Sequence, residues 1–186
     1  METVLINVLL ADDDEDDRLF FIEAFGEIKI KTRVKTVNDG VELMDHLTKN
    51  GNELPHILFL DLNMPRKNGL DCLLEIKSSE RLKDIPIAIY STSASEEDVE
   101  DTFVKGANVY IKKPSDFGTL KKILEEVITV NWQYHTSNLN RETFLLNRKK
   151  QKCDHEPKSH FHIFFIHTEH TCNLNIRSHL CLWRIL

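Results

Sequence analysis

Between residues 4 and 129, five short apolar runs alternate with amphipathic stretches, and this alternation restricts the chain to few folds. The first run, residues 4–10, is almost continuously apolar, which is typical of a strand covered on both faces. Strands that alternate with helices form βα units, which place parallel strands side by side. The sequence therefore predicts an α/β fold with a doubly wound five-stranded parallel sheet. The expected strands are residues 4–10, 32–37, 57–60, 85–90 and 109–111.

The 186 residues suit one domain of ordinary size with an appendage, because two full domains need a longer chain. We expect a domain at residues 1–130 and a C-terminal extension at residues 131–147, which packs on the domain or lies at a dimer interface. Residues 148–186 form a tail containing histidine and cysteine, which we expect to be flexible. Zinc binding and an association-prone strand at residues 161–166 are alternatives, although the tail matches none of the strong zinc spacings.

The composition excludes several classes of protein. Apolar residues make up 41% and charged residues 29% of the chain, a balance typical of soluble globular proteins. The sequence contains neither a run of about 18 apolar residues nor a secretory leader, so we expect a cytoplasmic protein without a membrane partner. In the tail, seven lysines and arginines stand against three acidic residues, an excess too slight to indicate nucleic-acid binding.

Polar side chains follow four of the predicted strands. Asp12 and Asp13 come after the first strand, Asp61 after the third, Ser91 after the fourth and Lys113 after the fifth. In open α/β sheets, ligands bind beyond the carboxyl ends of the strands, where the strand order reverses. We therefore expect carboxylates, a hydroxyl and an amine to meet at one edge of the sheet.

These residue types together suit metal-dependent phosphoryl transfer. Three neighbouring carboxylates repel one another unless their pKa values rise or a cation binds, and hard oxygen ligands suit Mg²⁺. A carboxylate such as Asp61 can attack phosphorus and form an acyl phosphate when the charge on the phosphoryl oxygens is neutralised. Mg²⁺ and Lys113 would neutralise that charge, and Ser91 would donate a hydrogen bond to the phosphoryl group.

Four segments, VLLADDDEDD, LFLDLNMPRKNGLDCL, AIYSTSA and YIKKP, resemble the signatures of response-regulator receiver domains of two-component signalling. The resemblance covers about residues 4–130 and implies the flavodoxin-like receiver fold with strand order 2-1-3-4-5. The continuation Asn131-Trp132-Gln133-Tyr134 is similar to that of single-domain, phytochrome-associated response regulators.

The resemblance also implies roles for the metal ligands and the acceptor. Asp61 would accept a phosphoryl group from a sensor histidine kinase or a phosphotransfer protein. Asp12 and Asp13 would hold Mg²⁺ together with Asp61, and the backbone carbonyl of Asn63 would complete the protein ligands.

Four further residues acquire roles from the same resemblance. Lys113 would pair with the phosphoryl group, and Ser91 would bind it. Tyr110 would be the aromatic residue whose orientation switches with the state of the site. The peptide bond before Pro114 would be cis, which would fix the direction of the Lys113 side chain.

Three functions remain open on the sequence. The leading hypothesis is a stand-alone phosphorylation switch, not an enzyme, that signals by protein contact. An aspartate-based, Mg²⁺-dependent phosphatase or phosphotransferase of the haloacid dehalogenase kind would carry a second aspartate two residues after Asp61, where this chain has Asn63. The third is an interaction module that is never phosphorylated. A homodimer through the last two helices and the residues after Trp132 is a further expectation.

Overall fold

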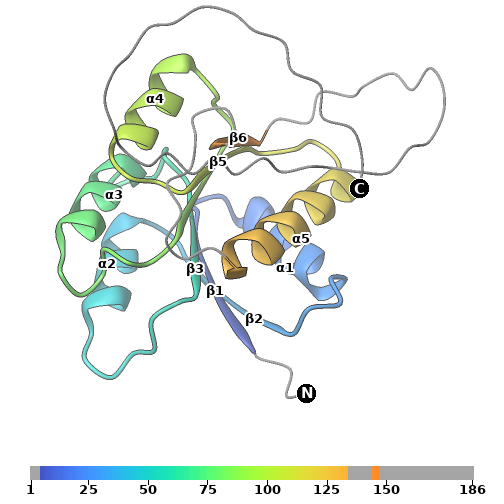
Figure 1. Ribbon diagram of the computed structural model, residues 1–186, viewed down its shortest axis with the longest axis horizontal. Helices are drawn as coiled ribbons and strands as arrows, with labels where there is room; N and C mark the ends of the chain where they lie inside the picture. The colour runs from blue at the N-terminus through green and yellow to red at the C-terminus, as the bar shows by residue number, and fades with distance from the viewer. Residues whose placement is uncertain (1–4, 134–143, 147–186) are drawn as a thin grey trace, which may run out of the picture. The chain divides into compact units, whose positions relative to one another are not determined.

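A parallel sheet with helices on both faces forms the domain (Figure 1). The computed structural model describes residues 5–133 and 144–146. Its strand order is β2-β1-β3-β4-β5-β6, and every neighbouring pair is parallel. The predicted five-stranded sheet with order 2-1-3-4-5 is therefore confirmed, and a two-residue strand is added beside β5. The strands are β1 (Ile6–Ala11), β2 (Thr32–Val37), β3 (Ile57–Leu60), β4 (Ile87–Ser91), β5 (Val109–Lys112) and β6 (Leu145–Leu146).

Five helices connect and cover these strands. Helices α1 and α5 lie on one face of the sheet, and α2, α3 and α4 lie on the other (Figure 1). Their bounds are α1 (Glu15–Gly26), α2 (Gly40–Thr48), α3 (Gly69–Ser78), α4 (Glu96–Val104) and α5 (Phe117–Gln133). None of the described helices is long and apolar enough to cross a membrane.

The side chains of β1 divide between two apolar layers, which explains its nearly continuous apolar sequence. Val8 and Leu10 belong to the cluster packed against α1 and α5, whereas Leu9 and Ala11 belong to the cluster packed against α2 and α3. All four are at most 2% exposed. Because helices cover both faces of the strand, neither face is exposed to water and both carry apolar residues.

Four helices begin with a side-chain cap near the carboxyl end of a strand. Asp14 accepts from the amides of residues 16 and 17 at the start of α1. Asp39, Asn68 and Ser95 cap α2, α3 and α4 in the same way. Each cap satisfies backbone amides that have no partner within the helix. The caps therefore fix where these four helices begin, at the edge of the sheet where functional residues were expected.

The segment that follows α5 in the described chain adds β6 to the sheet. Phe144 is completely buried, with its ring centroid 5.2 Å from that of Phe103 and 6.2 Å from that of Tyr110. Leu145 is in register with Tyr110 on β5. A strand at this position covers backbone groups that an exposed edge would leave unpaired. The predicted tail, residues 148–186, and most of the predicted extension lie outside the described residues. The predictions of zinc binding and of a strand at residues 161–166 fall on the same residues, so the structure does not test them.

Candidate functional site

An open pocket of about 560 Å³ brings together most of the residues expected at the carboxyl edge of the sheet. It lies among the residues that follow β1, β3, β4 and β5, so its walls come from segments far apart in the chain. The lining residues are Asp13, Asp14, Glu15, Asp16, Asp17, Asp61, Asn63, Thr92 and Lys113.

The ammonium group of Lys113 joins three carboxylates. Its Nζ atom lies 2.8 Å from Asp12 Oδ2, 2.7 Å from Asp17 Oδ2 and 3.1 Å from Asp61 Oδ2. Burial alone would lower the pKa of Lys113, but the carboxylates of Asp12, Asp17 and Asp61 raise it above its ordinary value. Lys113 is therefore a fixed positive charge beside the carboxylate of Asp61.

Asp12 is completely buried, whereas Asp61 is largely buried but still lines the pocket. Asp12 is 0% exposed and Asp61 is 6% exposed. Desolvation raises the pKa of Asp12 to about 6, although its bond to Lys113 opposes this rise. The Oδ1 atom of Asp61 accepts a hydrogen bond of 3.3 Å from the backbone N–H of Asn63. Burial therefore disfavours the anionic form of Asp12, and positive charge beside its carboxylate stabilises that form.

Asp12, Asp13 and Asp61 can each direct one carboxylate oxygen to a common point, because these atoms lie within 4.8 Å of one another. Asp17 adds a fourth carboxylate to this group, and the ammonium group of Lys113 contacts three of the four, those of Asp12, Asp17 and Asp61. Oxygen donors of this kind suit Mg²⁺ or Mn²⁺ and are poor ligands for softer metals. The donor set and the raised pKa of Asp12 therefore fit a divalent cation.

Ser91 and Tyr110 lie beneath the surface rather than in the lining of the pocket. Ser91 is completely buried, and its hydroxyl has no hydrogen-bond partner of good geometry among the described residues. Its neighbour Thr92 lines the pocket instead. Tyr110 is also completely buried and donates a hydrogen bond of 3.0 Å to the carbonyl of Ser93. Burial raises the pKa of Tyr110 to about 12, so its hydroxyl keeps its proton.

Asp17 is a site residue that the sequence analysis missed. The acidic run was interpreted through Asp12 and Asp13 alone, yet Asp17 makes the shortest contact with Lys113. A usable signal was present, because the acidic run continues from Asp12 to Asp17 and Asp17 lies in the first turn of the helix that follows the strand.

The expectation of a cis peptide bond before Pro114 was wrong, since the described residues contain none. The direction of Lys113 is fixed by other means. Its backbone N–H donates a hydrogen bond of 2.8 Å to the carbonyl of Ser91, and its ammonium group is held by the three carboxylates.

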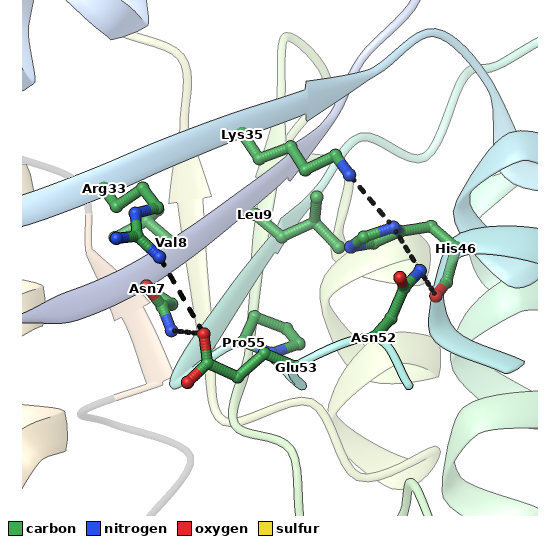
Figure 2. A pocket seen from close by; sticks show the side chains of 9 residues that line it. All are labelled: Asn7, Val8, Leu9, Arg33, Lys35, His46, Asn52, Glu53 and Pro55. Atoms are coloured by element: carbon green, nitrogen blue, oxygen red, sulfur yellow. Dashed lines mark hydrogen bonds and ion pairs between the residues drawn. The ribbon is translucent and has the colours of Figure 1, made fainter. Parts of the chain in front are cut away.

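A second cavity of about 200 Å³ shares no lining residue with the first (Figure 2). Lys35 Nζ lies 3.2 Å from Nδ1 of His46, and Asn52 donates 2.8 Å to the carbonyl of His46. Burial, followed by the charge of Lys35, lowers the pKa of His46. Asn7 donates 3.0 Å to Glu53. These polar groups pair chiefly with one another across the cavity (Figure 2), so the cavity adds nothing to the chemistry around Asp61.

The fold and the acidic pocket define a receiver domain, and comparison with known families agrees. The family profile of the response regulator receiver domain matches residues 8–125. The chain therefore belongs to the response regulator receiver family.

Three curated relatives have sequences similar to this chain. The chain is 32% identical over 123 residues to the probable methanogenesis regulatory protein FilR2 of Methanothrix harundinacea, covering 64% of this chain and 79% of that protein. It is 30% identical over 124 residues to the response regulator Rcp1 of Synechocystis sp., covering 64% and 84%. It is 31% identical over 126 residues to the chemotaxis protein CheY1 of Helicobacter pylori, covering 68% and 99%.

Two solved structures are similar throughout the domain. The phosphorylated cyanobacterial phytochrome response regulator RcpA has a TM-score of 0.65 and 30% identity, covering 72% of this chain and 98% of RcpA. The Mn²⁺-bound form of Rcp1 has a TM-score of 0.62 and 28% identity, covering 71% and 97%. The protein is thus a receiver homologous to single-domain response regulators and acts in phosphorelay signalling. Neither the phosphatase nor the unphosphorylated module is favoured by these relatives.

Proposed function

We propose that Asp61 is the phosphoacceptor of a metal-dependent switch that is not an enzyme and that signals through protein contacts. The donor is a sensor histidine kinase or a phosphotransfer protein. The observation that carries this proposal is the position of Asp61, which lines an open pocket while Lys113 lies 3.1 Å from its carboxylate. An acceptor needs access to its donor and a positive charge beside it, and Asp61 has both.

The transfer follows from the groups around Asp61. A carboxylate oxygen forms a bond to phosphorus while the bond from phosphorus to the histidine nitrogen of the donor breaks, and that nitrogen takes the electron pair. Lys113 can pair with the phosphoryl oxygens because its charge is permanent. The N–H of Asn63, which donates to Oδ1 of Asp61, helps to hold the carboxylate in position.

Asp12, Asp13 and Asp61 would hold Mg²⁺ through their side chains, and Asn63 would do so through its backbone carbonyl. The ion supplies positive charge that offsets the negative charge on the phosphoryl oxygens. The fit of the three carboxylates supports this assignment. A relative, Rcp1, has been crystallised in a Mn²⁺-bound form.

Ser91 and Tyr110 would report the phosphorylated state. The hydroxyl of Ser91 has no hydrogen-bond partner of good geometry among the described residues and would donate to a phosphoryl oxygen. Any reorientation of Tyr110 would break its bond to Ser93 and disturb the ring of Phe144. Phosphorylation would therefore change the surface formed by the β5–β6 edge and α4, where a partner protein would bind.

Chemical mapping tests the acceptor directly. The protein is incubated with acetyl phosphate with and without Mg²⁺, reduced with borohydride, digested and analysed by mass spectrometry. Borohydride converts an acyl phosphate of aspartate into homoserine, so we expect homoserine at position 61 only in the sample with Mg²⁺. Homoserine at another aspartate, or none in any sample, would contradict the proposal.

We also propose a homodimer through α4, α5 and the residues after Trp132. Its support is the Asn131-Trp132-Gln133-Tyr134 sequence and the side chain of Val104, which leaves α4 with an apolar residue that is 72% exposed. Sedimentation velocity with Mg²⁺, with and without beryllofluoride, is expected to show a dimer in the activated sample. A monomer under both conditions would count against the dimer.

A further inference from the structure

The loop between β3 and α3 contains a strained turn. Arg66 has a φ of 64°, and it is the only non-glycine residue with positive φ in the described part of the chain. The N–H of Lys67 donates a hydrogen bond of 2.7 Å to the carbonyl of Pro65, which closes a three-residue turn centred on Arg66. This form of γ-turn is rare, and non-glycine residues in it persist only where the surroundings hold them.

Two close backbone contacts fix the ends of this loop. A Cβ atom on Gly40 would lie 2.3 Å from the carbonyl oxygen of Lys67, so the loop touches the first turn of α2 without room for a side chain. A Cβ atom on Gly69 would lie 2.0 Å from the carbonyl oxygen of Asp61. The loop therefore fills the space between α2 and the backbone of the acceptor residue, and it has little freedom to shift without disturbing Asp61.

An ion pair joins the strained residue to α2. The guanidinium group of Arg66 donates to Oδ2 of Asp39. The other oxygen of Asp39 accepts from the amides of Val41 at 2.8 Å and Glu42 at 2.9 Å, which caps α2. The side chain of Asp39 is 7% exposed, whereas that of Arg66 is 60% exposed, so the pair joins a largely buried carboxylate to a guanidinium group at the surface. Removing Arg66 would leave Asp39 with the amides of α2 as its hydrogen-bond partners.

The titration behaviour of Asp39 agrees with this geometry. Burial alone would raise its pKa, but Arg66 and the two amides of α2 lower the pKa below its ordinary value. Asp39 is therefore an anion at neutral pH, and its two oxygens have separate tasks. One oxygen caps the N-terminus of α2, and the other accepts from Arg66 in the loop.

We propose that the Arg66–Asp39 ion pair is a latch that positions Asn63 for metal binding, which makes both residues positioning residues of the site. Asn63 lies three residues before Arg66 and already contacts Asp61 through its N–H. Met64, which lies between them in the sequence, has a side chain buried in the core, so the short segment from Asn63 to Arg66 is anchored in its middle. This inference rests on the proposed function, because it assumes that the pocket binds Mg²⁺.

The test separates the ion pair from the strain and from the helix cap. Asn tolerates positive φ, so Arg66→Asn removes the guanidinium without adding backbone strain. Asp39→Asn keeps the capping oxygen and removes the charge. Lys67→Gln is the matched control, because it breaks an ion pair from the same loop to Glu75 on α3 rather than to α2. Calorimetry measures the Mg²⁺ dissociation constant of each full-length unphosphorylated protein, and thermal unfolding confirms that each is folded.

We expect Arg66→Asn and Asp39→Asn each to raise the Mg²⁺ dissociation constant by about tenfold, at the lower end of effects of residues that orient metal ligands. The double variant should match either single variant, since each removes the same interaction. Arg66→Lys should restore part of the affinity, and Lys67→Gln should leave it unchanged.

A dissociation constant within twofold of wild type in both Asn variants would overturn the latch, even if their unfolding temperatures fall. Effects that multiply in the double variant would overturn it as well. The proposed function fails in a different way, because wild type itself would then bind no Mg²⁺ or form no acyl phosphate at Asp61.

Discussion

Asp61→Asn is expected to reduce labelling by acetyl phosphate at saturating Mg²⁺ by at least about 10³-fold, a typical loss when a nucleophile is removed. The amide has the same size as the carboxylate but no anionic oxygen with which to attack phosphorus. Lys113 retains Asp12 and Asp17 as partners in this variant, so the pocket should keep its shape. Radiolabelling followed by gel electrophoresis measures the effect.

Asp17→Asn provides the comparison for this experiment. It removes one of the three carboxylates around Lys113 but leaves the acceptor in place, so we expect labelling at a reduced rate. Labelling of Asp61→Asn equal to that of wild type would show that another residue accepts the phosphoryl group.

The second large effect concerns stability. Asp12→Asn is expected to raise the free energy of unfolding of the metal-free protein at pH 7.5 by about 1–3 kcal/mol. Burial raises the pKa of Asp12 from its ordinary 3.8 to about 6, a difference of roughly two units at 1.36 kcal/mol each. The lost bond to Lys113 offsets part of this gain, although Lys113 keeps its bonds to Asp17 and Asp61.

The sign of the pH dependence follows from the same shift. At pH 7.5, Asp12 is ionised in both states, and the folded state is the one in which the anion is disfavoured. As the pH falls from about 7 to about 4, the folded protein takes up the proton before the unfolded chain does, so wild type gains stability relative to the variant. The advantage of Asp12→Asn should therefore disappear near pH 4.

Urea unfolding at pH 7.5 and pH 4.5, in EDTA and in Mg²⁺, measures these differences. Mg²⁺ should stabilise wild type, because a ligand that binds only the folded state shifts the equilibrium toward it. Asp12→Asn should lose most of this response. A variant less stable than wild type in EDTA at pH 7.5 would contradict the electrostatic explanation.

The sheet and most of the pocket could be predicted from local patterns, because a buried parallel strand shows itself as an apolar run. The residue that follows such a strand lies at a known edge. These two rules predicted that Asp61 and Lys113 lie close together, although 51 residues, positions 62 to 112, separate them in the sequence. Asp12 and Asp13 followed from the same rule.

The remaining features depend on contacts between side chains that no local pattern encodes. Arg66 and Asp39 lie in two different loops, and no local sequence pattern at either residue predicts that they form an ion pair. The strand β6 has two residues, too few for a periodicity, and its placement follows from the burial of Phe144 between Phe103 and Tyr110. The geometry before Pro114 was inferred from resemblance alone, and it was wrong.

The sixth strand has a practical consequence for anyone who prepares this domain in isolation. A recombinant fragment that stops at residue 130, where the sequence pattern ends, would lack Phe144 and the backbone partners that β6 gives to β5. Its outer strand would offer free amide and carbonyl groups beside the rings of Tyr110 and Phe103, a surface that invites aggregation during purification. A fragment that continues beyond Leu146 keeps this edge protected.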